Sequence, residues 1–322
     1  MKELNKYLSV LSSTASKSDY PFYAQYLLSK DGYVITCDGL GFTRVNCKLP
    51  FEGCINFFVL KSILSKVSDS AIFGQKDNTL EITDDSYKTS LNIITIDIPE
   101  VDKPKIDVIE VTPQLLDILK LSSRFTGSDI LSNIFVCNNF ICATDETKLF
   151  YHPMETSIST VGLPKQIFSI LTSTDCKLGA FNNNILIEFD GGYSVFTSSI
   201  MDYYPSQDIL TFVNTINESK IELCEMSQLK NAIDKLSPIF FGESTQVVDI
   251  LNKSNKLIVS AQSSVHGKSE IITTSSLKDK FSMRLNSSQL NAIPLEYKVY
   301  ISEKKGDMLL FSNEESIIIV RG

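Results

Sequence analysis

One helix-and-strand pattern occurs three times along the chain, with a period of roughly one hundred residues. Each copy opens with apolar residues at helical spacing: Leu4, Leu8 and Leu11; Leu115, Leu116 and Leu119; Met226, Leu229, Ile233 and Leu236. In the second copy Thr112 suits a helix N-cap and Pro113 the first helical position. A period this long indicates duplicated domains rather than a solenoid.

Each opening helix is followed by a β-hairpin pattern. The strand runs lie at 22–28 and 33–38, at 132–137 and 140–145, and at 247–251 and 256–261. Their turns contain Asp31-Gly32, Asn138-Asn139 and Ser254-Asn255, residue types that tolerate positive φ. A second helix is predicted at 56–68, 163–173 and 286–293, and a last hairpin at 71–83, 177–189 and 298–311.

The repeated order predicts an α+β fold of three similar domains, with antiparallel sheets and helices on one face. Polar stretches at 102–105 and 214–218 have the composition of linkers. We therefore expect domains at 1–103, 104–216 and 217–322.

Composition limits the compartment and the redox chemistry. No apolar run approaches the roughly 18 residues of a membrane-spanning helix, and residues 1–5 lack the apolar core of a signal peptide. The expected location is cytoplasmic, without a membrane partner. The seven cysteines are odd in number and form no CxxC motif, so buried, reduced thiols are expected rather than disulfides or a zinc site.

No set of residues predicts catalysis. The histidines, His152 and His266, fall in expected loops, and no phosphate-binding GxxxxGK[ST] motif occurs. The paired carboxylates Asp84-Asp85 and Glu314-Glu315 fall in expected turns. The sequence therefore predicts a protein that is not an enzyme, with no catalytic residues, no metal and no cofactor.

Charge is distributed unevenly. The formal net charge is −8, yet the six predicted helices sum to +6, which leaves −14 for the rest. Lys2 and Lys6, and likewise Lys120 and Arg124, are four residues apart, so each pair projects from one helix face. Charge alone favours the simpler interpretation that these are the solvated faces of amphipathic helices. The cations of the six helices are Lys2, Lys6, Lys61, Lys66, Lys120, Arg124, Lys165, Lys230 and Lys235.

Three segments resemble a known family. Residues 141–149, ICATDETKL, are similar to the "ATDGHRLA" stretch of the bacterial sliding clamp, the β subunit of DNA polymerase III. Residues 196–205 are similar to its "SRLIDGRFPDY" stretch, and 51–56 to the lead into its second helix. Glu146 and Lys148 depart from the Gly and Arg usual in the family. The departures indicate a divergent member, of the kind that phages or plasmids encode.

The resemblance implies a DNA clamp fold and a ring. Helices would line a hole that attracts phosphates through the nine cations named above, without reading sequence. The expected partners are double-stranded DNA, a DNA polymerase, a clamp loader and a second copy of the chain. The protein would act as a processivity factor.

The resemblance also implies two protein-binding surfaces. A peptide pocket for polymerase and loader would use Leu131, Thr144, Lys148, Leu149, Ile209, Leu210, Ile319 and Val320. The ring would close head to tail as a homodimer through Leu91, Ile93, Ile239, Phe240 and Phe241. For Leu149, Ile319, Phe240 and Phe241, a place in the core is the competing expectation.

Three other functions remain possible on the sequence alone. A β-rich structural protein built from duplicated domains would need no lysine enrichment on its helices. An enzyme with an unrecognised site is disfavoured by the absence of any catalytic set. A two-domain trimeric clamp is disfavoured by the three copies.

Overall fold

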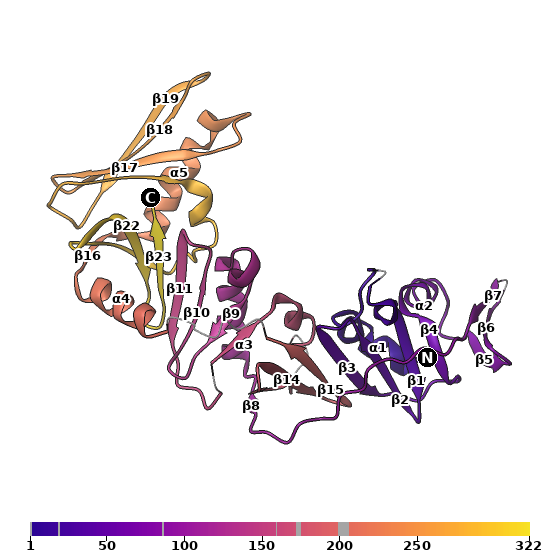
Figure 1. The fold of residues 1–322 in the computed structure, drawn as a ribbon. Coiled ribbons are helices and arrows are strands. Elements are labelled where there is room, and N and C mark those ends of the chain that lie inside the picture. The colour runs from indigo at the N-terminus through magenta and orange to yellow at the C-terminus, as the bar shows by residue number, and fades with distance from the viewer. Residues whose placement is uncertain (1, 19, 86, 159, 172–174, 199–205) are drawn as a thin grey trace. The chain divides into compact units, whose positions relative to one another are not determined.

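The structure is a computed structural model that describes residues 2–18, 20–85, 87–158, 160–171, 175–198 and 206–322 (Figure 1). The chain forms two compact units, Met1–Leu116 with Ser157–Ser199, and Asp117–Thr156 with Ile200–Gly322. The expected middle domain, 104–216, contributes strands to both units, so the three-domain partition stays a prediction. Among the described helices, none has the length and apolar character needed to cross a membrane.

The first unit is built on an eight-stranded antiparallel sheet. Its central join pairs β3 (Gly41–Asn46) with β15 (Gly192–Thr197), where the hydroxyls of Thr43 and Ser194 hydrogen-bond at 2.7 Å. The strand order is β4 (Gly53–Asn56), β1 (Tyr26–Lys30), β2 (Tyr33–Cys37), β3, β15, β14 (Asn184–Phe189), β13 (Lys177–Phe181) and β8 (Ile109–Glu110).

Alternate residues of this sheet face different covers, as the two-residue period of a strand requires. On one face Thr36 donates its hydroxyl to the carbonyl of Leu11 at the end of α1 (Lys2–Ser12), at 3.0 Å. On the other face Ile35 packs with Ile98 of the irregular segment 93–108. The sheet therefore has a helical cover and an irregular cover.

The helical cover includes α2 (Phe57–Leu64). The Asn56 side chain accepts from the backbone N–H groups of Phe58 and Val59, both at 3.1 Å, which fixes the start of the helix. Phe57 and Leu60 are fully buried. The unit also contains η1 (Phe22–Gln25), β12 (Val161–Leu163), η4 (Lys165–Ser169) and a three-stranded sheet of β5 (Ile72–Lys76), β6 (Thr79–Asp84) and β7 (Tyr87–Asn92).

The second unit repeats the arrangement. Here β11 (Lys148–Pro153) pairs with β23 (Ile317–Arg321), and Phe150 stacks on Phe125 of η2 (Ser123–Phe125), with ring centroids 5.7 Å apart. The strands that this unit contributes to its sheet follow in the order β9 (Ile134–Val136), β10 (Phe140–Thr144), β11, β23, β22 (Lys305–Ser312), β21 (Lys298–Ser302) and β16 (Lys220–Glu225). The helix α3 (Pro113–Ser122) precedes η2, and η3 (Asp129–Ser132) follows it.

A four-stranded sheet completes the second unit, in the order β19 (Gly267–Thr274), β18 (Lys256–Ser263), β17 (Val247–Lys253) and β20 (Phe281–Asn286). It is covered by α5 (Met226–Leu236), which buries Met226, Leu229, Ala232 and Leu236 and is followed by η5 (Ser237–Phe240). The predicted turn at Ser254-Asn255 has φ values of 51° and 62°. The positive φ at both turn residues confirms the turn expected from the sequence.

Two sequence predictions about structure were wrong. The expected linker at 214–218 lies inside a helix, α4 (Ser206–Glu218), whose Val213 and Ile216 are buried. His152 is not a loop residue: it lies in β11, is 7% exposed, and its Nδ1 is 2.8 Å from the hydroxyl of Ser316.

Two shorter elements also differ from expectation. The helices expected at 163–173 and 286–293 are 3₁₀ segments, η4 and η6 (Ser287–Leu290), although residues 172 and 173 lie outside the described part. All seven cysteines are buried thiols, as predicted.

Candidate functional site

The cations that the sequence analysis expected in the first unit lie on its helical cover. Lys6 on α1 and Lys66, just after α2, are exposed, and so is Lys165 on η4. Lys2 begins α1, but its side chain lies outside the described residues. Ser9 of α1 and Lys165 line one open hollow of about 390 Å³, which places η4 beside α1 on the same face of the sheet.

Lys61 differs from the other cations of this unit. Its side chain is half-buried, and its Nζ donates to the hydroxyl of Ser12 at 2.7 Å and lies 5.9 Å from the centre of the Phe57 ring. It therefore ties α2 to α1. A lysine held in this way contributes its charge to the surface but reaches a ligand less freely than Lys6.

In the second unit the expected cations lie on three elements. Lys120 on α3, Arg124 on η2 and Lys235 on α5 are exposed, whereas Lys230 is half-buried. The helix missed by the sequence, α4, carries Asp208 and Glu218 and no lysine. Positive charge therefore belongs to particular helices and not to every helix.

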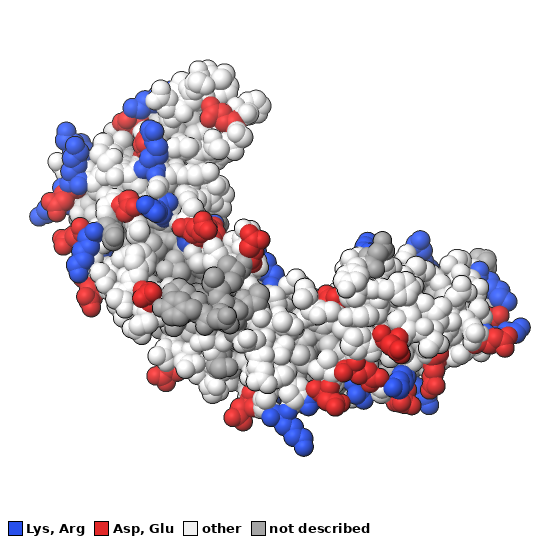
Figure 2. Space-filling view, in the orientation of Figure 1, with Lys and Arg blue, Asp and Glu red and all other residues white. Residues whose placement is uncertain are grey.

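Figure 2 shows the charge distribution on one face of the molecule. In the first unit most of the acidic side chains in view gather around the ends of β1 and β2, at the edge opposite α2. The charged side chains seen closest to α2 are basic. Within this unit the view agrees with a cationic helical side and an acidic edge.

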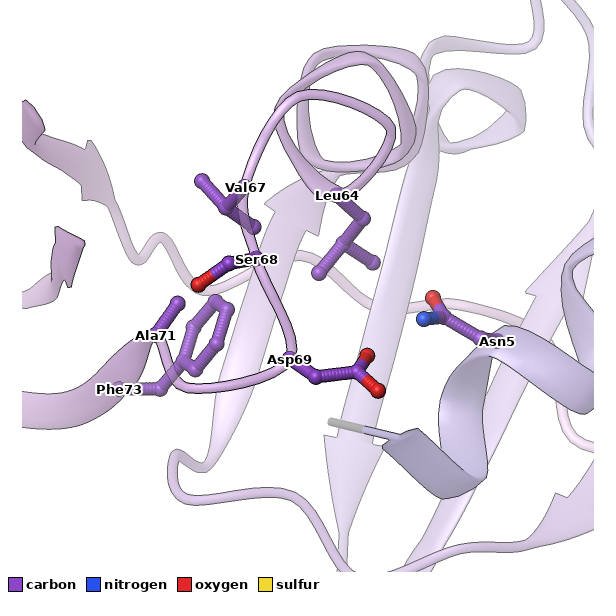
Figure 3. A pocket seen from close by; sticks show the side chains of 7 residues that line it. All are labelled: Asn5, Leu64, Val67, Ser68, Asp69, Ala71 and Phe73. Carbon is purple, nitrogen blue, oxygen red and sulfur yellow. The ribbon is translucent and has the colours of Figure 1, made fainter.

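A small pocket lies beside the first unit's helices. It has a volume of about 100 Å³, and the side chains of Asn5 and Asp69 point toward it from α1 and from the turn after α2 (Figure 3). Leu64, Val67 and Phe73 form its apolar part. None of the residues expected in the peptide pocket is among those that line it, so it is not the expected peptide pocket.

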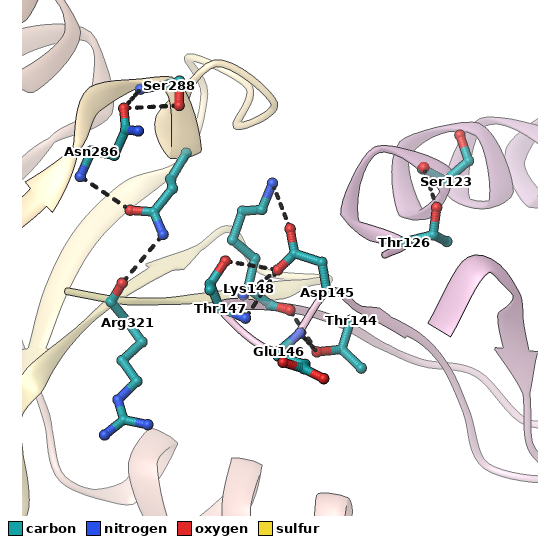
Figure 4. Close-up of polar contacts among 11 residues, drawn as sticks. Ser123, Thr126, Thr144, Asp145, Glu146, Thr147, Lys148, Asn286, Ser288 and Arg321 are labelled. Carbon is teal, nitrogen blue, oxygen red and sulfur yellow. Dashed lines mark hydrogen bonds and ion pairs between the residues drawn. The ribbon is translucent and has the colours of Figure 1, made fainter. Parts of the chain in front are cut away.

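The expected peptide pocket is anchored by the loop between β10 and β11. Asp145 Oδ1 accepts from the backbone N–H of Thr147 at 3.0 Å and of Lys148 at 2.7 Å, and Asp145 Oδ2 forms an ion pair with Lys148 Nζ at 3.0 Å (Figure 4). Burial acts to raise the pKa of Asp145, but hydrogen bonds from Lys148 and Thr147 outweigh it and the pKa is lowered. The loop is therefore held by an ionised carboxylate.

The other residues of that expected pocket belong to the second unit. Leu131, Thr144 and Leu149 are half-buried, and so are Ile209 and Leu210 at the start of α4. Leu149, Ile209 and Leu210 all pack against one apolar cluster that contains Ile319. Ile319 and Val320 are 4% and 0% exposed, so these two can support a pocket but offer little surface to a ligand.

The expected interface residues separate into core and surface. Phe240 is 3% exposed and Ile93 is 9% exposed, so both are core residues. Leu91 and Ile239 are half-buried. Phe241 is 81% exposed, and its carbonyl lies 3.0 Å from Nε2 of His266.

Sequence reasoning missed two exposed apolar residues of the β18–β19 hairpin. Val265 is 77% exposed and Ile272 on β19 is 58% exposed. The signal was present in the alternation of β19, where Ile271 and Ile272 point to opposite faces, so one of the two must leave the core.

Comparisons with known proteins give the fold. A Thermotoga maritima DNA polymerase III β subunit has a TM-score of 0.82 at 14% identity, covering 99% of this chain and 96% of that one. A putative β subunit from Eubacterium rectale gives 0.81 at 13%, over 99% and 97%. A Helicobacter pylori β clamp bound to a DNA ligase peptide gives 0.77 at 18%, over 99% and 97%. No protein-family model and no curated protein sequence matches the chain.

These likenesses extend over nearly the whole chain and confirm the α+β clamp fold expected from the repeats. The identities are low, so the chain is a divergent example of that fold. Of the three segments that carried the resemblance, positions 199–205 lie outside the described residues.

Proposed function

We propose that the chain is a DNA sliding clamp: a non-enzymatic processivity factor that closes as a homodimer around duplex DNA and tethers a replicative polymerase. The observation that carries the proposal is the way its sheets are joined. The clamp fold of the similar structures and the cations on the helices support the same function.

The two joins inside the chain follow one rule. The fourth residue after the turn at 31–32 is Thr36, which pairs with Thr43 on β3. The fourth residue after the turn at 138–139 is Ala143, which pairs with Phe150 on β11. Thr43 then pairs with Ser194 on β15, and Phe150 with Ile318 on β23. Each copy has a first group of three strands, which contains its first hairpin, and a last group of three strands, which contains its last hairpin. Each join links the third strand of a first group to the last strand of a last group, β3 to β15 and β11 to β23.

One strand of each kind remains for a third join. By position β19 is the third strand of the third copy's first group, and β7 is the last strand of the first copy's last group. In the described part of the chain each lies at the edge of its sheet. An uncovered edge strand is a template for pairing with another chain. Pairing β19 with β7 of a second copy, twice, gives a closed head-to-tail dimer with two-fold symmetry.

The register of the third join follows from the β3–β15 join, because β13–β14 and β5–β6 both pair without a register shift, whereas β21–β22 contains one. The fourth residue after the turn at 254–255, Val259, pairs with Ile271. Counting from the turns at 77–78 and 182–183 makes Ile82 equivalent to Ile187, so that Thr89 takes the place of Ser194. We therefore expect Ile271 opposite Thr89 of the second copy. Ile272 then lies opposite Lys88 of the second copy.

A cysteine pair tests that register. Ile272→Cys with Lys88→Cys places two exposed residues opposite each other, at a separation that a disulfide bridges. Oxidation should give a covalent dimer. The matched control, Ile272→Cys with Ser90→Cys, is off by two positions and should crosslink poorly. Equal yields for both pairs would contradict the register, and the native cysteines should not interfere because all seven are buried.

The charge distribution suits a ring on DNA. Exposed lysines and an arginine, on long side chains, contact phosphates without reading bases, and weak contacts allow sliding while the closed ring prevents release. The acidic remainder of the chain would keep DNA off the outside. In the proposed ring the cationic helical cover faces the hole.

The loop at 145–148, with Leu149 and the start of α4, is the proposed site for partner peptides of polymerase and loader. It is supported by a related case, since the Helicobacter pylori clamp of similar structure is bound to a DNA ligase peptide. Primer extension with a replicative polymerase and its loader measures the function itself. Addition of the chain should lengthen the products, and unchanged product length would contradict the proposal.

A further inference from the structure

The loop that anchors the proposed peptide site has a structural equivalent in the first unit. In both loops an aspartate N–H donates to the carbonyl of the third residue after it: Asp38 to Gly41 at 3.1 Å, and Asp145 to Lys148 at 3.2 Å. Asp38 Oδ1 accepts from the N–H of Leu40 at 3.0 Å and of Gly41 at 2.7 Å, the same distances as in the Asp145 loop.

The two loops also share backbone conformation and docking. The residue after the aspartate has positive φ in both, +89° at Gly39 and +75° at Glu146. Each loop then accepts a hydrogen bond from the end of the joined strand, from Thr197 to Leu40 at 2.8 Å and from Arg321 to Thr147 at 2.9 Å. The first unit therefore contains the same loop framework as the proposed peptide site of the second unit.

The framework in the first unit encloses a cavity of about 270 Å³. Its walls are mainly apolar and include Leu40 of the loop, Phe42 of β3, Val195 of the joined strand and Val101 of the irregular cover. Leu40 is 72% exposed at the mouth. A bulky side chain presented to the outside of a formed apolar cavity is typical of a site for an apolar anchor residue.

The electrostatic surroundings of the two frameworks differ. In the second unit Lys148 neutralises Asp145, whereas the equivalent of Lys148 in the first unit is Gly41. Asp38 and Asp102 adjoin the lining residues Gly39 and Val101 in the sequence, but Asp38 itself lines a separate hollow together with Lys165. Neither carboxylate has an ion pair in the described part of the chain. No lysine or arginine is among the residues described as lining the cavity. With no cation among its lining residues and Asp102 next to Val101, the cavity favours a cation on the ligand.

We propose that this cavity is a second peptide site, which takes a short extended segment of a partner protein with a bulky apolar side chain next to a lysine or arginine. The proposal extends the proposed function, because it gives one clamp subunit two peptide sites with different charge preference. The first unit's site prefers basic segments, and the second unit's site, with its neutralised aspartate, does not.

Selection from a displayed library of random seven-residue peptides on the intact wild-type chain provides the probes. Each enriched peptide is synthesised with a fluorophore, and its affinity for the wild type, for Leu40→Asp and for Thr147→Asp is measured by anisotropy. Thr147 is the structural equivalent of Leu40 and is also exposed, so the two variants are matched. Circular dichroism and urea midpoints verify that both fold, and Val101→Asp gives a second variant of the same cavity.

At least one enriched class should contain an aromatic or long aliphatic residue beside Lys or Arg. Its affinity should fall about tenfold or more in Leu40→Asp, because the new carboxylate must lose water when the peptide covers it. In Thr147→Asp the affinity should change by less than about twofold. The proposal is overturned if no peptide is enriched, or if every enriched peptide binds Leu40→Asp and Val101→Asp as well as wild type. Retention on DNA is measured in a separate experiment. The peptide affinities therefore test this proposal even if the chain does not form a ring around DNA.

Discussion

Replacing Asp145 by Asn tests how the loop of the proposed peptide site is held. The amide keeps an acceptor at Oδ1 for the N–H groups of Thr147 and Lys148, but it loses the negative charge and the 3.0 Å ion pair with Lys148. The two side chains of that pair are 15% and 20% exposed, so the pair is only partly screened by water.

The expected cost follows from the bonds that change. A hydrogen bond to a neutral acceptor contributes a net of about 1 kcal/mol to the free energy of unfolding, and a bond to a charged acceptor contributes about 1.5–3 kcal/mol. The two backbone bonds and a third bond, from the Thr147 hydroxyl to Asp145 Oδ1, are all weakened. With the lost ion pair, the free energy of unfolding should fall by about 2 kcal/mol. Asp38→Asn is the matched control: it weakens two such bonds and removes no ion pair, so it should cost about 1 kcal/mol.

The effect should depend on pH in one direction. Because the folded-state pKa of Asp145 is lowered, its contribution is fully present above the unfolded value, about 3.9, and is lost as pH falls through the folded value. The gap between wild type and Asp145→Asn should thus be constant near pH 7 and shrink below about pH 4. Urea unfolding followed by circular dichroism measures it. A gap that persists at the lowest pH, or an equal cost for Asp38→Asn, would refute the reasoning.

Three further changes test other parts of the molecule. Alanine at the exposed cations Lys6, Lys120 and Arg124 should shorten primer-extension products and weaken DNA retention with the fold intact. Unchanged product length would count against a role of these cations in DNA binding. Burial lowers the pKa of His152, so the neutral form is favoured; the wild type should lose stability as pH falls below about 6.5, and His152→Asn should lose less across the same range in urea titrations. Phe240→Ala should cost about 3–4 kcal/mol of unfolding free energy because the ring is buried, whereas Phe241→Ala should leave stability within about 0.5 kcal/mol of wild type. In sedimentation Phe241→Ala should weaken dimerisation, and an unchanged dimer would remove Phe241 from the interface.

The repeated pattern was readable because local chemistry and global fold agree in the hairpins. Asp31-Gly32 and Ser254-Asn255 stand at the turns, and the apolar stripe of α5 is its buried face. At the turns, residue types that tolerate positive φ lie between two strand patterns, and in α5 the apolar residues recur with the period of a helix. Such agreement allowed the hairpins within each copy to be predicted.

The missed helix, α4, shows where composition misleads. Its apolar period was present in Ile209, Val213 and Ile216, but the polar run around it resembled a linker. In the structure Thr211 and Thr215 donate their hydroxyls to the carbonyls four residues before them, at 2.8 Å each, which helix-interior threonines can do. Burial against the apolar cluster of the second unit outweighs the weak helix propensity.

The sites were less readable than the fold. His152 was misread because the following proline suggested a loop, yet Pro153 is the last residue of β11 and removes no ladder bond inside it. The equivalence of the loops at Asp38 and Asp145 could not be read from sequence, because they share one aspartate and little else. It rests on backbone geometry, which very different side chains can support.

The most direct test of the central claim is whether topology holds the protein on DNA. The pair Ile272→Cys with Lys88→Cys is oxidised in the presence of nicked circular DNA at low salt, and the mixture is then filtered at about 1 M salt, where screening leaves little attraction to phosphates. We expect covalent dimer to elute with the circle and to be released when a restriction enzyme cuts the DNA once. Loss of the dimer from the intact circle at high salt, or retention after cutting, would contradict a ring around DNA.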